Sequence, residues 1–101
     1  MAIKGIVIDP GHGGSDPGAV GNDIKEKEYT LLISKYMYDR FKKLGVPVSL
    51  TRNDDITLSP SNRAKKARSF YGDSKDVIVI SNHLNAGGGD GQSVTNIKYN
   101  N

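Results

Sequence analysis

Two unbroken apolar runs constrain what this chain of 101 residues can fold into. Residues 6–8 read Ile-Val-Ile and residues 77–80 read Val-Ile-Val-Ile, and no polar residue interrupts either run. A strand with one wet face alternates apolar and polar side chains, whereas a strand covered on both faces of a parallel sheet is apolar throughout. We therefore expect both runs to be central strands of a parallel sheet.

Two helices are predicted between these strands. Apolar residues at helical spacing run from residue 26 to residue 44, and Gly45 follows them where a helix commonly ends. The second helix is expected to have Ser59 as its N-cap and Pro60 as its first residue, and to end before Gly72. The stripe expected to face the sheet on the first helix comprises Tyr29, Leu32, Ile33, Tyr36, Met37, Phe41 and Leu44.

Another strand, the second in chain order, is predicted between the two helices. Val46, Val48 and Leu50 alternate with Pro47 and Ser49, and the proline, which cannot donate a ladder hydrogen bond, favours the edge of the sheet. Right-handed crossovers then give the strand order 2-1-3 for this β-α-β-α-β pattern. The predicted fold class is α/β: one domain, residues 1–101, with a mostly parallel sheet between layers of helices.

Both histidines of the chain follow the central strands, His12 in IVIDPGHGG and His83 in VIVISNHLNA. Strand order reverses between strands 1 and 3, and open α/β sheets bind ligands at such a point, beyond the carboxyl ends of the strands. Neighbouring strands lie about 4.8 Å apart, so the two imidazoles are expected side by side. The bare glycine loop would let His12 turn inward.

The acid that could join these imidazoles in a metal site comes from the first helix. The chain has two glutamates, Glu26 and Glu28, both in the first turn of that helix. At 100° per residue, Glu26 lies roughly 30° from the centre of the apolar stripe and Glu28 roughly 130°, so Glu26 is expected to face the sheet. His12, Glu26 and His83 would leave the fourth position of zinc open, as catalytic rather than structural sites do.

Simpler roles exist for the same residues. A histidine after a strand can bond to its loop neighbours, and a first-turn glutamate complements the helix dipole. Asp9 could be a further ligand, but its place at the end of the first strand equally suits an acceptor for an imidazole N–H, and we expect the second role. The stretch GHGGSDPGAVG lacks the spacing of phosphate-binding loops, and the chain has no Gly-x-Ser-x-Gly nucleophile elbow.

The amino-acid composition limits which metal ligands and which classes of partner the chain can have. Without cysteine, metal ligands are limited to imidazole, carboxylate and water. The net charge of +3 is small and spread over both predicted helices, so we expect no nucleic-acid partner. No apolar run approaches the ~20 residues of a membrane span or resembles a secretory signal. We expect a chain made in the cytoplasm without a signal peptide, and no membrane partner.

Several blocks of the sequence, in order, resemble the zinc-dependent N-acetylmuramoyl-L-alanine amidases of bacterial autolysins and phage endolysins. The blocks are IVIDPGHGGSDPGAVG, KEKEYTLLIS, LTRNDD, LSPSNRAKKA and SNHLNAG. The resemblance implies that His12, Glu26 and His83 bind Zn²⁺, and that the amide between N-acetylmuramic acid and the L-alanine of the stem peptide is hydrolysed. The substrate would be peptidoglycan, reached after release or lysis. Arg52 and Arg63 match recurrent family positions, and we expect surface or helix-capping roles for them rather than catalytic ones.

One carboxylate of that family has no counterpart in this chain. In the family a glutamate in a later segment acts as general base, whereas GQSVTNIKYNN contains no acid and looks unlike the family's usual continuation. The resemblance therefore predicts a catalytic domain without its C-terminal part, and the catalytic residue is unknown. Asp16, Asp23 and Asp90 are the remaining loop acids near the predicted site.

Two functions stay open on this basis. One is a cell-wall amidase, and the other is a catalytically silent module that binds zinc and the wall or regulates a partner. The outer edge of the third strand is expected to be bare or paired with a short C-terminal strand at residues 93–99. Unpaired edges favour association, so a homodimer through this edge is also predicted.

Overall fold

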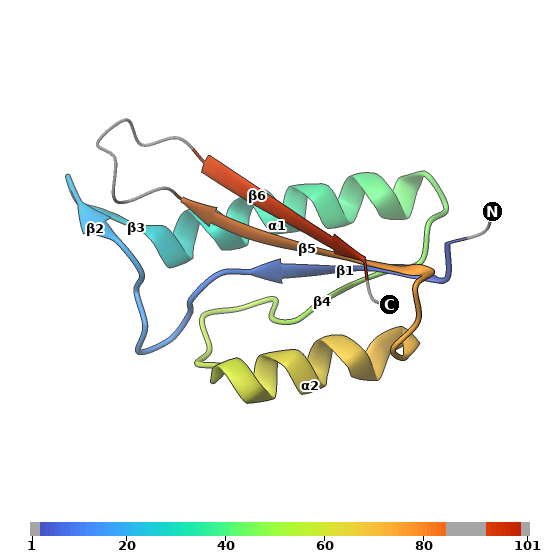
Figure 1. Cartoon of the computed structure of the whole chain (residues 1–101). Coiled ribbons are helices and arrows are strands. Elements are labelled where there is room, and N and C mark those ends of the chain that lie inside the picture. The colour runs from blue at the N-terminus through green and yellow to red at the C-terminus, as the bar shows by residue number, and fades with distance from the viewer. Residues whose placement is uncertain (1–2, 85–92, 100–101) are drawn as a thin grey trace.

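Four strands form the main sheet of the computed structural model, which describes residues 3–84 and 93–99 (Figure 1). They are β1 (Gly5–Pro10), β4 (Val48–Leu50), β5 (Val77–Leu84) and β6 (Ser93–Tyr99). The order is β4-β1-β5-β6; the first three strands are parallel, and β6 runs antiparallel to β5. The predicted order 2-1-3, its edge strand and the C-terminal strand are confirmed. Because β6 pairs with β5, that edge of β5 is not bare, and a homodimer through an exposed sheet edge stays a prediction.

Two helices cover opposite faces of this sheet (Figure 1). They are α1 (Glu26–Lys43) and α2 (Pro60–Tyr71), and α2 begins as predicted, with Ser59 Oγ accepting a hydrogen bond from Asn62 N at 3.2 Å. Since β4 and β5 lie on opposite sides of β1, two right-handed crossovers put the helices on opposite faces. The α/β prediction with three layers is thus confirmed. Within the described part of the chain, neither helix has the length and apolarity needed to cross a bilayer.

The centre of the sheet carries the core. All residues of β1 are buried, as its unbroken apolar run predicts for a strand covered on both faces. Ile6, Ile8 and Ile80 form the core cluster. Partly buried residues that pack against it are Met37, Tyr38, Phe41, Val46, Val48, Leu50 and Ile78. Because α1 supplies three of these, Ile6 and Ile8 face α1, and the alternating residues Val7 and Asp9 face α2.

The face of α1 that meets the sheet differs in part from the predicted stripe. Four residues of that stripe are exposed: Tyr29, Leu32, Tyr36 and Leu44. The inward face instead combines apolar Met37 and Phe41 with buried Glu26, Thr30 and Ser34. Its N-terminal half packs against main chain at the strand ends, where Thr30 Oγ1 donates to Gly11 O at 2.7 Å. A face that must bond to polar groups cannot be predicted from apolarity alone.

A two-stranded hairpin precedes α1 and is absent from the sequence prediction. Its strands are β2 (Val20–Gly21) and β3 (Ile24–Lys25). The turn between them places Asn22 and Asp23 in left-handed backbone, with φ of 50° and 63°. Asn and Asp favour such two-residue turns, so the signal was present in the sequence. The hairpin fixes where α1 begins, because Glu26 N donates to Ala19 O at 2.8 Å.

Ile8→Ala should destabilise the protein strongly, whereas Leu32→Ala should not. Ile8 is fully buried in the core cluster, so truncation leaves a cavity and is expected to lower the free energy of unfolding by about 2–5 kcal/mol. Leu32 is 65% exposed, and its truncation is expected to change that energy by about 0.5 kcal/mol at most. Urea unfolding of both variants measures the difference, and equal losses would contradict the described orientation of α1.

Candidate metal centre

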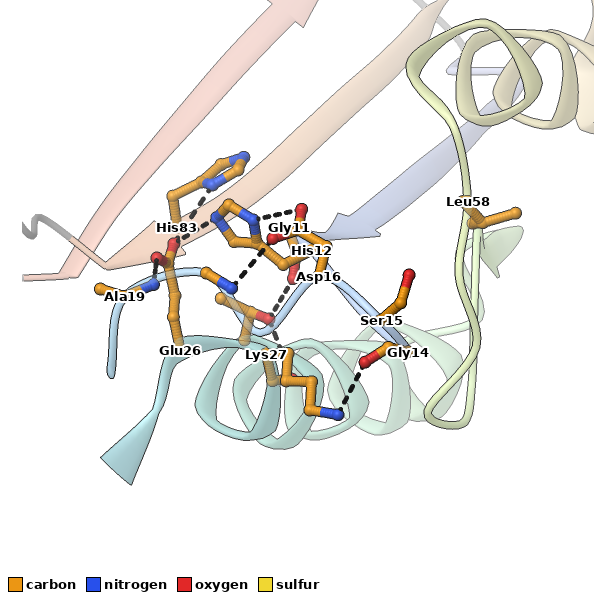
Figure 2. Close-up of polar contacts among 12 residues, drawn as sticks. Gly11, His12, Gly14, Ser15, Asp16, Ala19, Glu26, Lys27, Leu58 and His83 are labelled. Carbon is orange, nitrogen blue, oxygen red and sulfur yellow. Dashed lines mark hydrogen bonds and ion pairs between the residues drawn. The ribbon is translucent and has the colours of Figure 1, made fainter. Parts of the chain in front are cut away.

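His12, Glu26 and His83 converge at the carboxyl end of the sheet (Figure 2). His12 lies in the loop after β1, Glu26 is the first residue of α1, and His83 lies near the end of β5. One ligand atom from each lies within 4.8 Å of the others. His12 Nε2 is 3.0 Å and His83 Nδ1 is 3.3 Å from Glu26 Oε2. The three residues that the sequence singled out are therefore brought together.

The backbone around His12 explains why its loop is rich in glycine. His12 itself has a φ of 64°, in the left-handed region, which turns the chain back at the end of β1. A Cβ on Gly11 would lie 2.6 Å from the His83 ring, and one on Gly18 would lie 2.6 Å from the His12 ring. Both contacts are too short for any side chain. Glycine at these positions lets the two imidazoles approach to 5.1 Å between ring centroids.

Glu26 is held in its ionised form. The residue is 3% exposed; its Oε1 accepts from Ala19 N at 2.9 Å and its Oε2 from Leu84 N at 3.0 Å. Burial alone would raise the pKa of Glu26, but these two N–H groups and the neighbouring His12 outweigh it and hold the pKa below its usual value. Glu28 is exposed, so the predicted inward and outward directions of the two glutamates are confirmed.

Asp16 is the carboxylate that bonds to the other nitrogen of His12. Its Oδ2 lies 2.9 Å from His12 Nδ1, and its Oδ1 accepts from Gly18 N at 3.1 Å. The hydrogen bond from His12, followed by that from Gly18, lowers the pKa of Asp16. In the tautomer of His12 that carries its proton on Nδ1, Asp16 accepts that proton and the lone pair of Nε2 faces Glu26. Sequence reasoning noted Asp16 only as a loop acid; its spacing of four residues from His12 was the available signal.

The arrangement fits a divalent cation. The Nε2 lone pair of His12 and the Glu26 carboxylate are both acceptors, so a proton or a cation must lie between them for the contact to be favourable. Around a tetrahedral ion with bonds of about 2.0–2.2 Å, ligand atoms are separated by about 3.4 Å. The two separations from Glu26 Oε2, 3.0 and 3.3 Å, are close to that value, and the three ligand atoms all lie within 4.8 Å of one another. Two imidazoles and one carboxylate are ligands that suit zinc.

Asp9 does not bond to an imidazole, so the prediction for it is wrong. Its Oδ1 accepts from Thr51 Oγ1 and Arg63 Nη1, both at 2.7 Å, and its Oδ2 accepts from Ser81 Oγ at 2.9 Å. The reason is the alternation of side chains along β1, which directs Asp9 to the α2 face of the sheet. Glu26 approaches from α1, on the other face.

Surface or helix-capping roles were predicted for Arg52 and Arg63, but Arg52 is buried and Arg63 is only partly exposed. Arg52 is 1% exposed and donates to main-chain carbonyls. Its acceptors are the oxygens of Pro10, Gly11, Lys27 and Asp54. Arg63 pairs with Asp9 and donates to His12 O at 2.9 Å. Beyond the end of a strand, carbonyls lose their ladder partners, and these guanidinium groups replace them.

The acids that remain offer no general base at this cluster. Asp16 is engaged by His12, and Glu28 and Asp23 are exposed on α1 and in the β2–β3 turn. Asp90 lies outside the described residues. The catalytic residue left unknown by the sequence is therefore not identified by the described contacts.

A separate cavity of about 520 Å³ lies at the β4 edge, between α1 and α2. Its lining includes Tyr38, Leu50 and Phe70, and none of the three clustered residues. Chemistry is located by converging donor atoms rather than by volume, so we take the cluster as the candidate site.

Sequence comparison identifies relatives over most of the chain. Residues 6–100 match the family described as N-acetylmuramoyl-L-alanine amidase, so the C-terminal segment expected to look unlike the family lies within the match. The sporulation-specific N-acetylmuramoyl-L-alanine amidase of Bacillus subtilis is 40% identical over 90 residues, which are 85% of this chain and 33% of that protein. The probable cell wall amidase LytH of Staphylococcus aureus is 42% identical over 82 residues, which are 78% of this chain and 28% of LytH.

Solved structures share the fold. Cwp6 from Clostridium difficile superposes with a TM-score of 0.76 at 35% identity, over 89% of this chain and 14% of that one. The N-acetylmuramoyl-L-alanine amidase AmiC2 of Nostoc punctiforme gives a TM-score of 0.71 at 33% identity, over 84% of this chain and 46% of that one. The chain thus spans less than half the length of these relatives. It belongs to the N-acetylmuramoyl-L-alanine amidase family.

Proposed function

We propose that this chain is a zinc-dependent peptidoglycan hydrolase that cleaves the amide between N-acetylmuramic acid and the L-alanine of the stem peptide. The observation that carries the proposal is the cluster of His12, Glu26 and His83, with ligand atoms within 4.8 Å of one another. Family membership supports the type of reaction, and relatives named as cell wall and sporulation amidases support the class of substrate.

The neighbours of the cluster keep its residues in the protonation states that a metal needs. N–H groups of Ala19 and Leu84 stabilise the negative charge of Glu26. Asp16 lies 2.9 Å from His12 Nδ1 and can accept its proton, a tautomer in which Nε2 would bind the metal. Three protein ligands leave one position for water and substrate, as in catalytic zinc sites. Zinc, when bound, would polarise the scissile carbonyl and activate water for attack on it.

A second candidate function is a silent module that binds zinc and the cell wall without turnover. Amide hydrolysis needs a group that takes a proton from water and passes one to the leaving amine. Glu26 is committed to the cluster and Glu28 is exposed on α1, so neither glutamate of the chain is available for that task. The two candidates share the metal site and differ only in turnover.

Zinc binding and wall digestion separate these candidates. The purified chain is expected to bind about one equivalent of zinc and, as an amidase, to release free stem peptide from peptidoglycan. Loss of a residue that only supports a metal ligand typically lowers metal affinity about 10–100-fold. His83→Ala removes a proposed ligand itself, so its zinc affinity should fall by more than that. Elemental analysis and chromatography of the digest measure the two results.

The exposed variant Leu32→Ala serves as the control and should match the wild type in both assays. Zinc binding without release of stem peptide would support the silent module instead. Absence of zinc binding by the wild-type chain would contradict both candidates.

Asp16→Asn should weaken zinc binding without unfolding the protein. The amide is a poorer acceptor for the Nδ1 proton of His12, and loss of such a partner typically costs about 10–100-fold in metal affinity. Asp39→Asn, an exposed substitution on α1, is the matched control and should leave the affinity unchanged. Competition with a chelator measures both dissociation constants, and equal values would show that Asp16 does not orient His12.

A further inference from the structure

Arg52 carries a positive charge in the protein interior, and its burial requires an explanation. It is 1% exposed, and burial lowers the pKa of its guanidinium, as expected when a cation leaves water. Within the described residues its hydrogen-bond partners are main-chain carbonyls and the Thr30 hydroxyl rather than a carboxylate. Removing a charge from water is costly, and a solvated side chain would avoid that cost.

One nitrogen of Arg52 joins the two segments that carry His12 and Glu26. Arg52 Nη2 donates to Gly11 O at 2.9 Å and to Lys27 O at 3.0 Å. Gly11 precedes His12 in the chain, and Lys27 follows Glu26. The same nitrogen therefore fixes the distance between the main chain of the loop and the main chain of α1, directly beside both candidate ligands.

Thr30 completes this connection from α1. It is fully buried, and its Oγ1 donates to Gly11 O at 2.7 Å and lies 3.2 Å from Arg52 Nη2. The carbonyl of Gly11 thus accepts from both side chains. The third candidate ligand is held by other contacts: Gly11 N donates to Asn82 O at 2.9 Å, next to His83.

We propose that Arg52 and Thr30 are positioning residues for the metal centre, which fix the separation of His12 from Glu26 and so set the metal affinity. This inference rests on the proposed zinc function. A metal site requires its ligands to be held within about 0.5 Å of the productive geometry by the residues that support them. Neither Arg52 nor Thr30 is a ligand, so both act through the main chain beside the ligands.

The test compares Thr30→Val with Thr30→Ser. Valine keeps the shape of threonine but removes the hydroxyl that donates to Gly11 O, whereas serine keeps it. Thr30→Val is expected to raise the zinc dissociation constant about 10-fold or more, and to alter the visible spectrum of bound Co²⁺. Thr30→Ser should retain the wild-type affinity and spectrum. Arg52→Lys keeps the charge but replaces the three-nitrogen fork, which also reaches Pro10 O and Asp54 O, by a single donor nitrogen, so it should weaken zinc binding as Thr30→Val does.

Ser49→Ala is the control for a loss of stability alone. It removes the hydrogen bond between Ser49 Oγ in β4 and Tyr71 OH (2.8 Å). It should lower the stability of the metal-free protein in urea but leave zinc affinity unchanged. If Thr30→Val binds zinc as tightly as the wild type, the inference is wrong while the proposed function stands. If the wild-type chain binds no zinc, both are overturned. The Thr30 pair decides the matter even if Arg52→Lys does not fold.

Discussion

The parallel pairing of β1 with β5 is the interaction on which the rest of the structure depends. The register opposes Asp9 to Ser81 and Pro10 to Asn82, so the two strands end side by side in the middle of the sheet. His83 extends β5, and His12 follows β1 after one further residue. Both imidazoles therefore meet because two apolar strands pair in one register.

Two arginines donate hydrogen bonds to the main-chain carbonyls at the end of β1. Its carbonyls leave the ladder in a region closed to water, and an unpaired buried carbonyl is costly. Arg52 and Arg63 donate to the oxygens of residues 10–12. A guanidinium offers five donors in a rigid fork and no acceptor, so it can bond to several carbonyls without acting as a ligand at the candidate cation site.

Much of this architecture follows from the sequence, because apolar spacing and turn chemistry act locally. The runs at β1 and β5, the Ser59 cap and the proline just before the edge strand predicted these elements and, with crossover handedness, the strand order. The convergence of His12 and His83 followed from that order. The roles of Asp9, Arg52 and Arg63 did not, because they depend on which polar groups at the strand ends lack partners. No spacing along the chain encodes that requirement.

The apolar stripe predicted for α1 is wrong in part for the same reason, which is the polar groups at the strand ends. These groups also explain why Glu26 is directed inward. Where α1 lies over the strand ends, its neighbours are carbonyls and amides, so Thr30 and Ser34 replace the apolar residues expected there. Glu26, one turn before Thr30, belongs to this polar half of the helix face and accepts from main-chain N–H groups. A buried carboxylate is stable only where such donors surround it. The same polar half of α1 thus supplies a candidate ligand and the hydroxyl that bonds to the His12 loop.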